Sequence, residues 1–409
     1  MIQEKYQVNV QEVSFNVTQN RVDSIRKKNI TRTGYRIYDQ GCMGVFGELG
    51  DSGLDPWAEA KAKLADQIAY PFSPVENRQE SREVPSDLDA DSILLSLEQI
   101  LEKARKRHPE FLISNKVNIL EKNVSLENDC QTRLSFKDRS LQVGLLLKHR
   151  DSVNIMDSFL DYQSRHWDPD FFLNELSRMV AAYNNLCPLP DEPLYVVTSA
   201  DLLTGKLVSE LNGEKVGYKN SLLMNDFGRQ AFHEQFCFYL DWDPNLHYHN
   251  SYFDAEGTII ESGRVNLIEN GVVRKAYTDK RTADRFHLPL TGSAACAYDG
   301  VPSLGAFNFS IERSGQTLKS LLNGRKGLIV VMASGGDYTD EGRFASPVQL
   351  ALLTDGDRII GRFPECSISG HLYDIFGKDY IGYSQDKFLF NQHALVVKMK
   401  IEAGRSAAT

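Results

Sequence analysis

The segment between positions 233 and 249 holds the residues whose types could bind a metal ion. Its histidines and acids are His233, Glu234, Asp241, Asp243, His247 and His249. His247 and His249 are two residues apart, so on a strand both side chains would lie on one face. Imidazoles and a carboxylate can hold zinc, and a set of His233, His247 and His249 would make the chain a metal-dependent hydrolase by itself.

The sequence that follows His233 argues against a metal-binding helix. His233-Glu234 is followed by Gln-Phe-Cys-Phe-Tyr, so the second histidine of an HExxH motif is absent. The alternation of Phe236, Phe238 and Leu240 predicts a strand instead. We therefore interpret the three histidines as structural or surface residues, and the metal site stays as an alternative.

Other catalytic patterns have little support. The chain has no Gly-x-Ser-x-Gly elbow for a nucleophilic serine. The glycine-rich segment 334–336 lacks the Gly-Lys-Thr ending of a phosphate loop, and it predicts a turn. Cys42 and Cys296 lie near glycines or small residues, which predicts buried thiols rather than nucleophiles.

The elements that must position these residues fall into two halves. The proline-rich segment Cys187-Pro-Leu-Pro-Asp-Glu-Pro predicts a linker between an N-terminal α/β domain, 1–187, and a mainly antiparallel β C-terminal domain, 188–409. The expected fold class is therefore α+β.

Periodicity and turn residues predict the elements within each half. In the first half we expect strands within 6–50 and 115–164, helices at 57–70, 93–104 and 169–185, and an exposed loop at 71–91. In the second half we expect helices at 199–211 and 317–322, and strands at 194–198, 236–240, 265–268, 327–332, 348–353 and 393–401.

Three blocks of sequence together point to a known family. The block 29–47 (NITRTGYRIYDQGCMGVFG) carries a Gly-Tyr-Arg-Ile strand and a glycine-rich turn. The block 253–293 combines an Asp-x-Glu-Gly turn with the phrase LIENG, and the block 346–376 combines a strand, an Asp-Gly turn and a second strand. In this order, the blocks resemble the TldD/PmbA peptidase family, and most closely its non-zinc-binding TldE or PmbA subunits.

The resemblance has a consequence for metal binding. In the TldD-type subunits a helix carries His-Glu-x-x-x-His, and a late cysteine is a further zinc ligand. The resemblance implies that the matching helix here, 200–211, has Thr204, Gly205 and Ser209 at those positions, and no cysteine follows Cys366. Hydroxyls are poor zinc ligands and glycine carries no base. We expect no catalytic residue, cofactor or metal in this chain, and zinc in a partner subunit.

Composition and charge bound the remaining possibilities. The net charge of −9 argues against a nucleic-acid partner, because phosphate binding needs clustered Lys and Arg. No run of 18 apolar residues is present, so we expect no membrane span. The six cysteines form no CxxC pair, which is typical of reduced thiols in a cytoplasmic protein.

The expected function follows from the resemblance. It implies the non-zinc-binding subunit of a TldD/TldE-type metallopeptidase complex that cleaves unfolded or linear peptides and peptide precursors. We expect this chain to be inactive alone. Its partner would be a TldD-like zinc subunit. The alternatives are the autonomous hydrolase with the His233, His247 and His249 site, and a non-enzymatic homodimer that binds peptides or regulates another protein.

Overall fold

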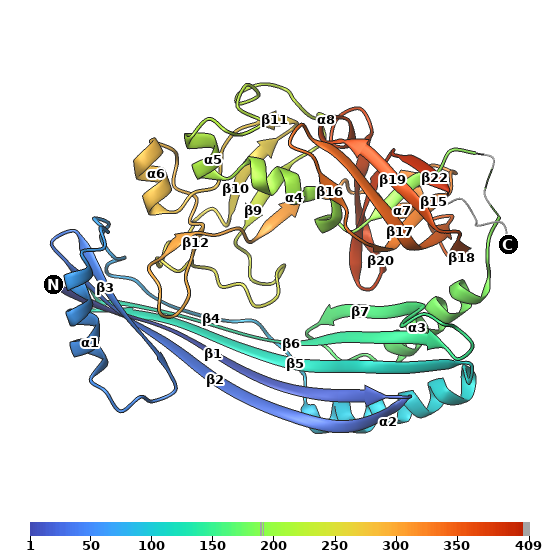
Figure 1. Cartoon of the computed structure of the whole chain (residues 1–409), viewed down its shortest axis with the longest axis horizontal. Coiled ribbons are helices and arrows are strands. Elements are labelled where there is room, and N and C mark those ends of the chain that lie inside the picture. Colours follow the sequence, from blue (N-terminus) through green and yellow to red (C-terminus); the bar gives the residue numbers. More distant parts are fainter. Residues whose placement is uncertain (189, 191, 404–409) are drawn as a thin grey trace.

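The computed structural model in Figure 1 describes residues 1–188, 190 and 192–403, and it confirms the α+β class. A seven-stranded sheet in the order β3-β2-β1-β5-β6 runs along the length of the molecule, with β4 and β7 both paired to β6. Its strands are β1 (Ile2–Thr18), β2 (Arg21–Asp39), β3 (Cys42–Leu49), β4 (Gln79–Glu83), β5 (Phe111–Asn128), β6 (Thr132–His149) and β7 (Ser158–Ser164).

Tight turns fix the register of these long strands. Two-residue turns with positive φ at both positions join β1 to β2 (Gln19 and Asn20) and β2 to β3 (Gln40 and Gly41). Such turns match the right-handed twist of paired strands. The side chain of Asn20 also bonds the backbone of Ile113 at 2.6 Å, which ties the first hairpin to β5.

Three helices cover this sheet: α1 (Pro56–Ala62), which continues as the 3-10 turn η1 (Lys63–Asp66), α2 (Ala90–Arg107) and α3 (Pro169–Asn184). Each begins after an aspartate whose carboxylate accepts backbone N–H bonds from the first turn: Asp55, Asp89 and Asp168. This capping satisfies amide groups that have no partner inside the helix. The helices predicted at 93–104 and 169–185 are confirmed.

The exposed loop predicted for 71–91 is wrong in its middle part. Residues Gln79–Glu83 form β4, which pairs in parallel with β6 from Arg133 to Lys137. The sequence QESRE has no apolar alternation, because most of this strand is exposed to solvent. Backbone pairing to β6 and an ion pair between Glu83 and Lys137 (3.0 Å) hold it in place.

The second half is mainly antiparallel sheet. A nine-stranded sheet follows the order β20-β21-β8-β15-β17-β19-β22, with β16 and β18 also paired to β17. Its strands are β8 (Tyr195–Thr198), β15 (Gly327–Ala333), β16 (Asp337–Tyr338), β17 (Arg343–Thr354), β18 (Ile359–Phe363), β19 (Cys366–His371), β20 (Tyr380–Leu389), β21 (Gln392–Val397) and β22 (Lys400–Ala403). Only the pairing of β8 with β15 is parallel among those described in this sheet.

A four-stranded sheet in the order β11-β10-β9-β14 and a small β12-β13 pair complete this half. Their strands are β9 (Phe238–Asp241), β10 (Arg264–Glu269), β11 (Val272–Val273), β12 (Ala294–Ala295), β13 (Ser303–Leu304) and β14 (Phe309–Ile311). The helices are α4 (Asp201–Glu210), α5 (Gly213–Gly217), α6 (Lys280–Phe286), α7 (Leu318–Leu322) and α8 (Leu372–Ile375). None of the described helices is long and apolar enough to cross a membrane.

One apolar cluster joins the two halves. It contains buried residues of α2, α3 and the long sheet together with Leu318, Ile329 and Val396 of the second half. The rings of Phe159 and Phe390 lie 5.5 Å apart across this contact. The boundary at 187/188 stays a prediction, and positions 189 and 191 of the predicted linker lie outside the described residues.

Candidate functional site

A cleft of about 390 Å³ is lined by the first turn of α4. Its other walls come from β9, β14, the loop after β9, and the hairpin of β20 and β21. The polar side chains along it include Asp201, Thr204, Asn245, His247, Ser310, Arg313, Lys387 and His393. Polar groups that converge on a concave surface from distant parts of a chain are typical of a binding site.

Helix α4 carries the three residues that the family resemblance singled out. Thr204 is buried and lines the cleft, whereas Gly205 and Ser209 are exposed. Gly205 and Ser209 are four residues apart, so they share one face of the helix. A Cβ added at Gly205 would meet no atom within 4 Å. Two hydroxyls and a glycine do not fit a zinc ion, and they leave no side chain to accept a proton from water.

His247 reaches the cleft from the loop that follows β9. Its Nε2 atom lies 3.3 Å from the Ser310 hydroxyl of β14. Burial lowers the pKa of His247, while Asp241 and Asp243 oppose that shift. A neutral imidazole beside a hydroxyl can donate or accept a hydrogen bond to a ligand.

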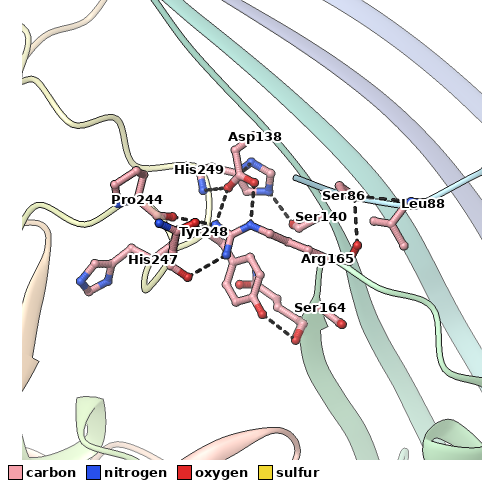
Figure 2. A network of polar contacts seen from close by, with 12 residues as sticks. Ser86, Leu88, Asp138, Ser140, Ser164, Arg165, Pro244, His247, Tyr248 and His249 are labelled. Atoms are coloured by element: carbon pink, nitrogen blue, oxygen red, sulfur yellow. Dashed lines mark hydrogen bonds and ion pairs between the residues drawn. The ribbon is translucent and has the colours of Figure 1, made fainter. Parts of the chain in front are cut away.

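The loop that carries His247 is held by Arg165 at the end of the long sheet (Figure 2). The Arg165 guanidinium donates to both carboxylate oxygens of Asp138, at 2.8 and 2.9 Å. It also donates to the backbone carbonyls of Pro244, Asn245 and His247 at 2.7 to 2.8 Å. A planar guanidinium has five N–H donors in fixed directions, so a single arginine side chain can hold several backbone carbonyls of one loop. The first half of the chain therefore positions a wall of the cleft.

His249 belongs to this anchor and not to the cleft. Its backbone N–H donates to Asp138 at 2.7 Å, and its Nε2 atom lies 2.7 Å from the Ser140 hydroxyl. Burial lowers the pKa of His249 to about 4, although Asp138 opposes the shift. His249 also has a φ of 61°, a left-handed conformation in which histidine is more frequent than most residues.

His233 lies apart from these two residues. Its backbone N–H donates to Phe376 at 2.8 Å, and its ring lies against Tyr380 with centroids 5.7 Å apart. Within residues 1–188, 190 and 192–403, no group of three or more His, Cys, Asp or Glu could hold a metal ion. The structure thus does not bring His233, His247 and His249 together.

Two predictions about this segment were wrong in detail. The strand predicted at 236–240 begins only at Phe238, and His233 lies in a turn before it. His247 and His249 lie in a loop, so the one-face argument for a strand does not apply. The local alternation of apolar residues predicted the strand, but tertiary bonds to Arg165 and Asp138 decide the path of the loop.

The basic side of the cleft was missed by sequence reasoning. Lys387 of β20 and His393 of β21 are directly opposite each other in the hairpin, and Arg313 approaches from the segment after β14. The turn between them, Phe390 and Asn391, has positive φ at both residues. A Phe-Asn pair is a weak turn signal, because bulky residues rarely adopt this conformation.

The Asp-x-Glu-Gly block forms a buried turn elsewhere. The Asp254 carboxylate accepts N–H bonds from Glu256, Thr258 and Ala294 at 2.8 to 3.0 Å. Burial raises the pKa of Asp254 to about 6 and that of Glu256 to about 7. Glu256 also accepts a hydrogen bond from the Tyr70 hydroxyl. The Tyr70–Glu256 bond joins the two halves, and the bonds to Asp254 hold the turn, so a structural role explains the acids.

The segment 334–336 joins β15 to β16 and is a turn, as predicted. Cys42 and Cys296 were predicted to be buried, but both are partly exposed. The Cys296 thiol donates to the carbonyl of Gly300 at 2.9 Å. Its pKa is raised, mainly by burial, which does not favour the reactive thiolate.

Comparison with known proteins identifies the family of the chain. Residues 197–401, half of the sequence, match the PmbA/TldA metallopeptidase C-terminal domain. The chain belongs to the PmbA/TldD family. The matched region contains every residue that lines the cleft.

Solved structures of similar fold support the assignment. TldE from Thermococcus kodakarensis superposes with a TM-score of 0.78 at 16% identity, covering 98% of this chain and 97% of that one. A Thermotoga maritima protein, solved as a candidate modulator of a DNA gyrase, gives 0.77 at 14% identity, with 98% and 96% covered. At such identities the likeness shows the PmbA/TldD fold alone.

A sequence relative covers a smaller part. An uncharacterised protein of Methanocaldococcus jannaschii is 26% identical over 179 residues, which is 43% of this chain. The match spans 41% of that protein's own length.

Proposed function

We propose that this chain is the non-zinc-binding subunit of a TldD/TldE-type metallopeptidase that acts in the cytoplasm on unfolded or linear peptides and peptide precursors. The observation that supports the proposal is the sequence of helix α4, because the family resemblance aligns its Thr204, Gly205 and Ser209 with the His, Glu and His of the zinc-binding subunits. A water molecule needs a metal or a base to become a nucleophile at neutral pH, and these side chains supply neither. A TldD-like partner would bring the zinc.

In this proposal, the cleft binds part of the peptide substrate. It adjoins a second hollow, lined by Phe159, Val331 and Phe388, and the two share Ser199, Gln392 and His393. Strand β14 also lies at one end of its four-stranded sheet, so one backbone edge faces no described strand. An extended peptide can bind such an edge as an added strand.

The test compares three samples on one unfolded substrate: this chain, a TldD-like partner, and their mixture. We expect no chelator-sensitive cleavage by this chain alone, and faster cleavage by the mixture than by the partner. Elemental analysis of the isolated chain should find no stoichiometric zinc. The idea fails if this chain alone cleaves at the rate of the mixture. About one zinc per chain, lost when His247 and His249 become Ala, would favour the autonomous hydrolase.

A further inference from the structure

Three basic side chains line one side of the cleft. Lys387 and His393 are cross-strand neighbours in the hairpin of β20 and β21, and Arg313 lines the same cleft. In a protein with a net charge of −9, two cations, Arg313 and Lys387, thus line the same concave surface as an imidazole.

The acids near this cluster are engaged elsewhere. Asp386, the neighbour of Lys387, accepts the backbone N–H of Leu318 at 2.8 Å and so caps α7. Glu312, the neighbour of Arg313, pairs with Arg264. In the described part of the chain, neither Arg313 nor Lys387 has an acidic group within ion-pair distance.

Asp201 is the acid that lines the cleft itself, and its field acts on other groups. Its charge opposes the lowering of the pKa of His247, and together with burial it raises the pKa of Tyr383. Burial and the charge of Arg313 lower the pKa of Lys387, and the same two causes, with Lys387, lower that of His393. The Nδ1 atom of His393 is buried without a hydrogen-bond partner.

The hairpin that presents these groups is rigidly anchored. Phe390 at its tip is buried with a φ of 54°, and its N–H donates to Glu175 of α3 at 3.2 Å. Arg178 of the same helix donates to the Phe388 carbonyl at 3.1 Å. An unusual backbone conformation persists only where the surrounding structure enforces it, and such positions cluster at ligand sites.

We infer that the cleft binds a carboxylate of its peptide between Arg313, Lys387 and His393. The inference rests on the proposed function for the presence of a peptide, and it adds a substrate class: peptides with an acidic side chain or a free C-terminal carboxylate at this point. A bound carboxylate would neutralise Arg313 and Lys387 and accept charge-assisted hydrogen bonds from them, and the neutral imidazole of His393 could donate one more hydrogen bond.

The test measures binding of three labelled, unstructured peptides to the full chain by fluorescence anisotropy at low salt. One peptide has a single Glu and an amidated C-terminus, the second has Gln in its place, and the third has Gln with a free C-terminus. We expect at least one carboxylate peptide to bind about tenfold more tightly than the neutral one, and added salt should reduce the difference. The two carboxylate peptides distinguish the two sources of the group.

Two double variants distinguish peptide binding in the cleft from a general effect of positive surface charge. The double variant Arg313→Gln/Lys387→Gln should bind all three peptides alike. The matched control, Lys103→Gln/Lys398→Gln, removes two exposed lysines elsewhere and should keep the difference. Equal binding of the three peptides to the unaltered chain would overturn the inference and leave the proposed function standing. If no peptide binds, the peptide-holding part of the proposed function fails as well.

Discussion

Asp138 shows how one buried residue can position a site that it does not touch. Its side chain is fully buried, and its two oxygens accept bonds from Arg165 and from the backbone of His249. A carboxylate without such partners would be costly to bury. Because Arg165 in turn donates to the carbonyls of Asn245 and His247 in the loop that lines the cleft, the position of His247 depends on a residue of β6.

His249 gives this anchor a dependence on pH. Its pKa in the folded chain is about 4, below its ordinary value of 6.5. The folded state therefore binds fewer protons than the unfolded state between these values. The contribution of His249 to stability is complete above pH 6.5 and is lost as pH falls toward 4, by roughly 2–3 kcal/mol. Replacing His249 by Asn, which tolerates the same backbone conformation, should remove this loss.

Urea unfolding at pH 7, 5.5 and 4.5 measures the effect as a difference between variant and parent. The difference is needed because the raised pKa values of Asp254 and Glu256 act with the opposite sign, stabilising the fold as pH falls below 7. His287→Asn is the matched control, since His287 has a φ of 53° and an exposed side chain. Parallel pH profiles for His249→Asn and the parent would contradict the prediction.

At the scale of elements, the sequence predicted those helices and strands whose position is set by local sequence signals. The helices at α2 and α3 follow from aspartate caps and apolar periodicity, and the long strands follow from alternation. β4 and β20 were missed, because β4 has no apolar side and β20 meets its partner through an unusual turn. The basic cluster could not be predicted for the same reason: Lys387 and His393 become neighbours only through that hairpin.

Two glycines should respond oppositely to the same substitution. Gly205 is an exposed residue of α4 with free space around it, so Gly205→Ala should stabilise the chain by about 0.5–1 kcal/mol through higher helix propensity. At Gly34 of β2 an added Cβ would lie 2.3 Å from the carbonyl oxygen of Tyr298. Gly34→Ala should therefore destabilise it by about 1–3 kcal/mol. Chemical denaturation of both variants tests this, and a neutral Gly34→Ala would show that the contact is not tight.

At the scale of the whole molecule, the cleft depends on both halves of the chain. The long sheet supplies Arg165 to one wall, and α3 supplies Glu175 and Arg178 to the hairpin that forms another. The apolar cluster between the halves buries Leu318, Ile329 and Val396 against α3 and the sheet. The sequence predicts a linker near a change of composition, but a pattern of residues cannot report how much surface two halves share.

This shared cluster predicts that cutting the linker will not release the halves. A site for a sequence-specific protease, inserted after Pro190, allows one cut between them. We expect the two fragments to co-elute at the size of the intact chain, and to separate only in denaturant, because separation would expose the apolar cluster to water. Size-exclusion chromatography before and after cleavage measures this. Fragments that separate without denaturant would mean that the halves are independent domains, and that the walls of the cleft are held together mainly by the linker.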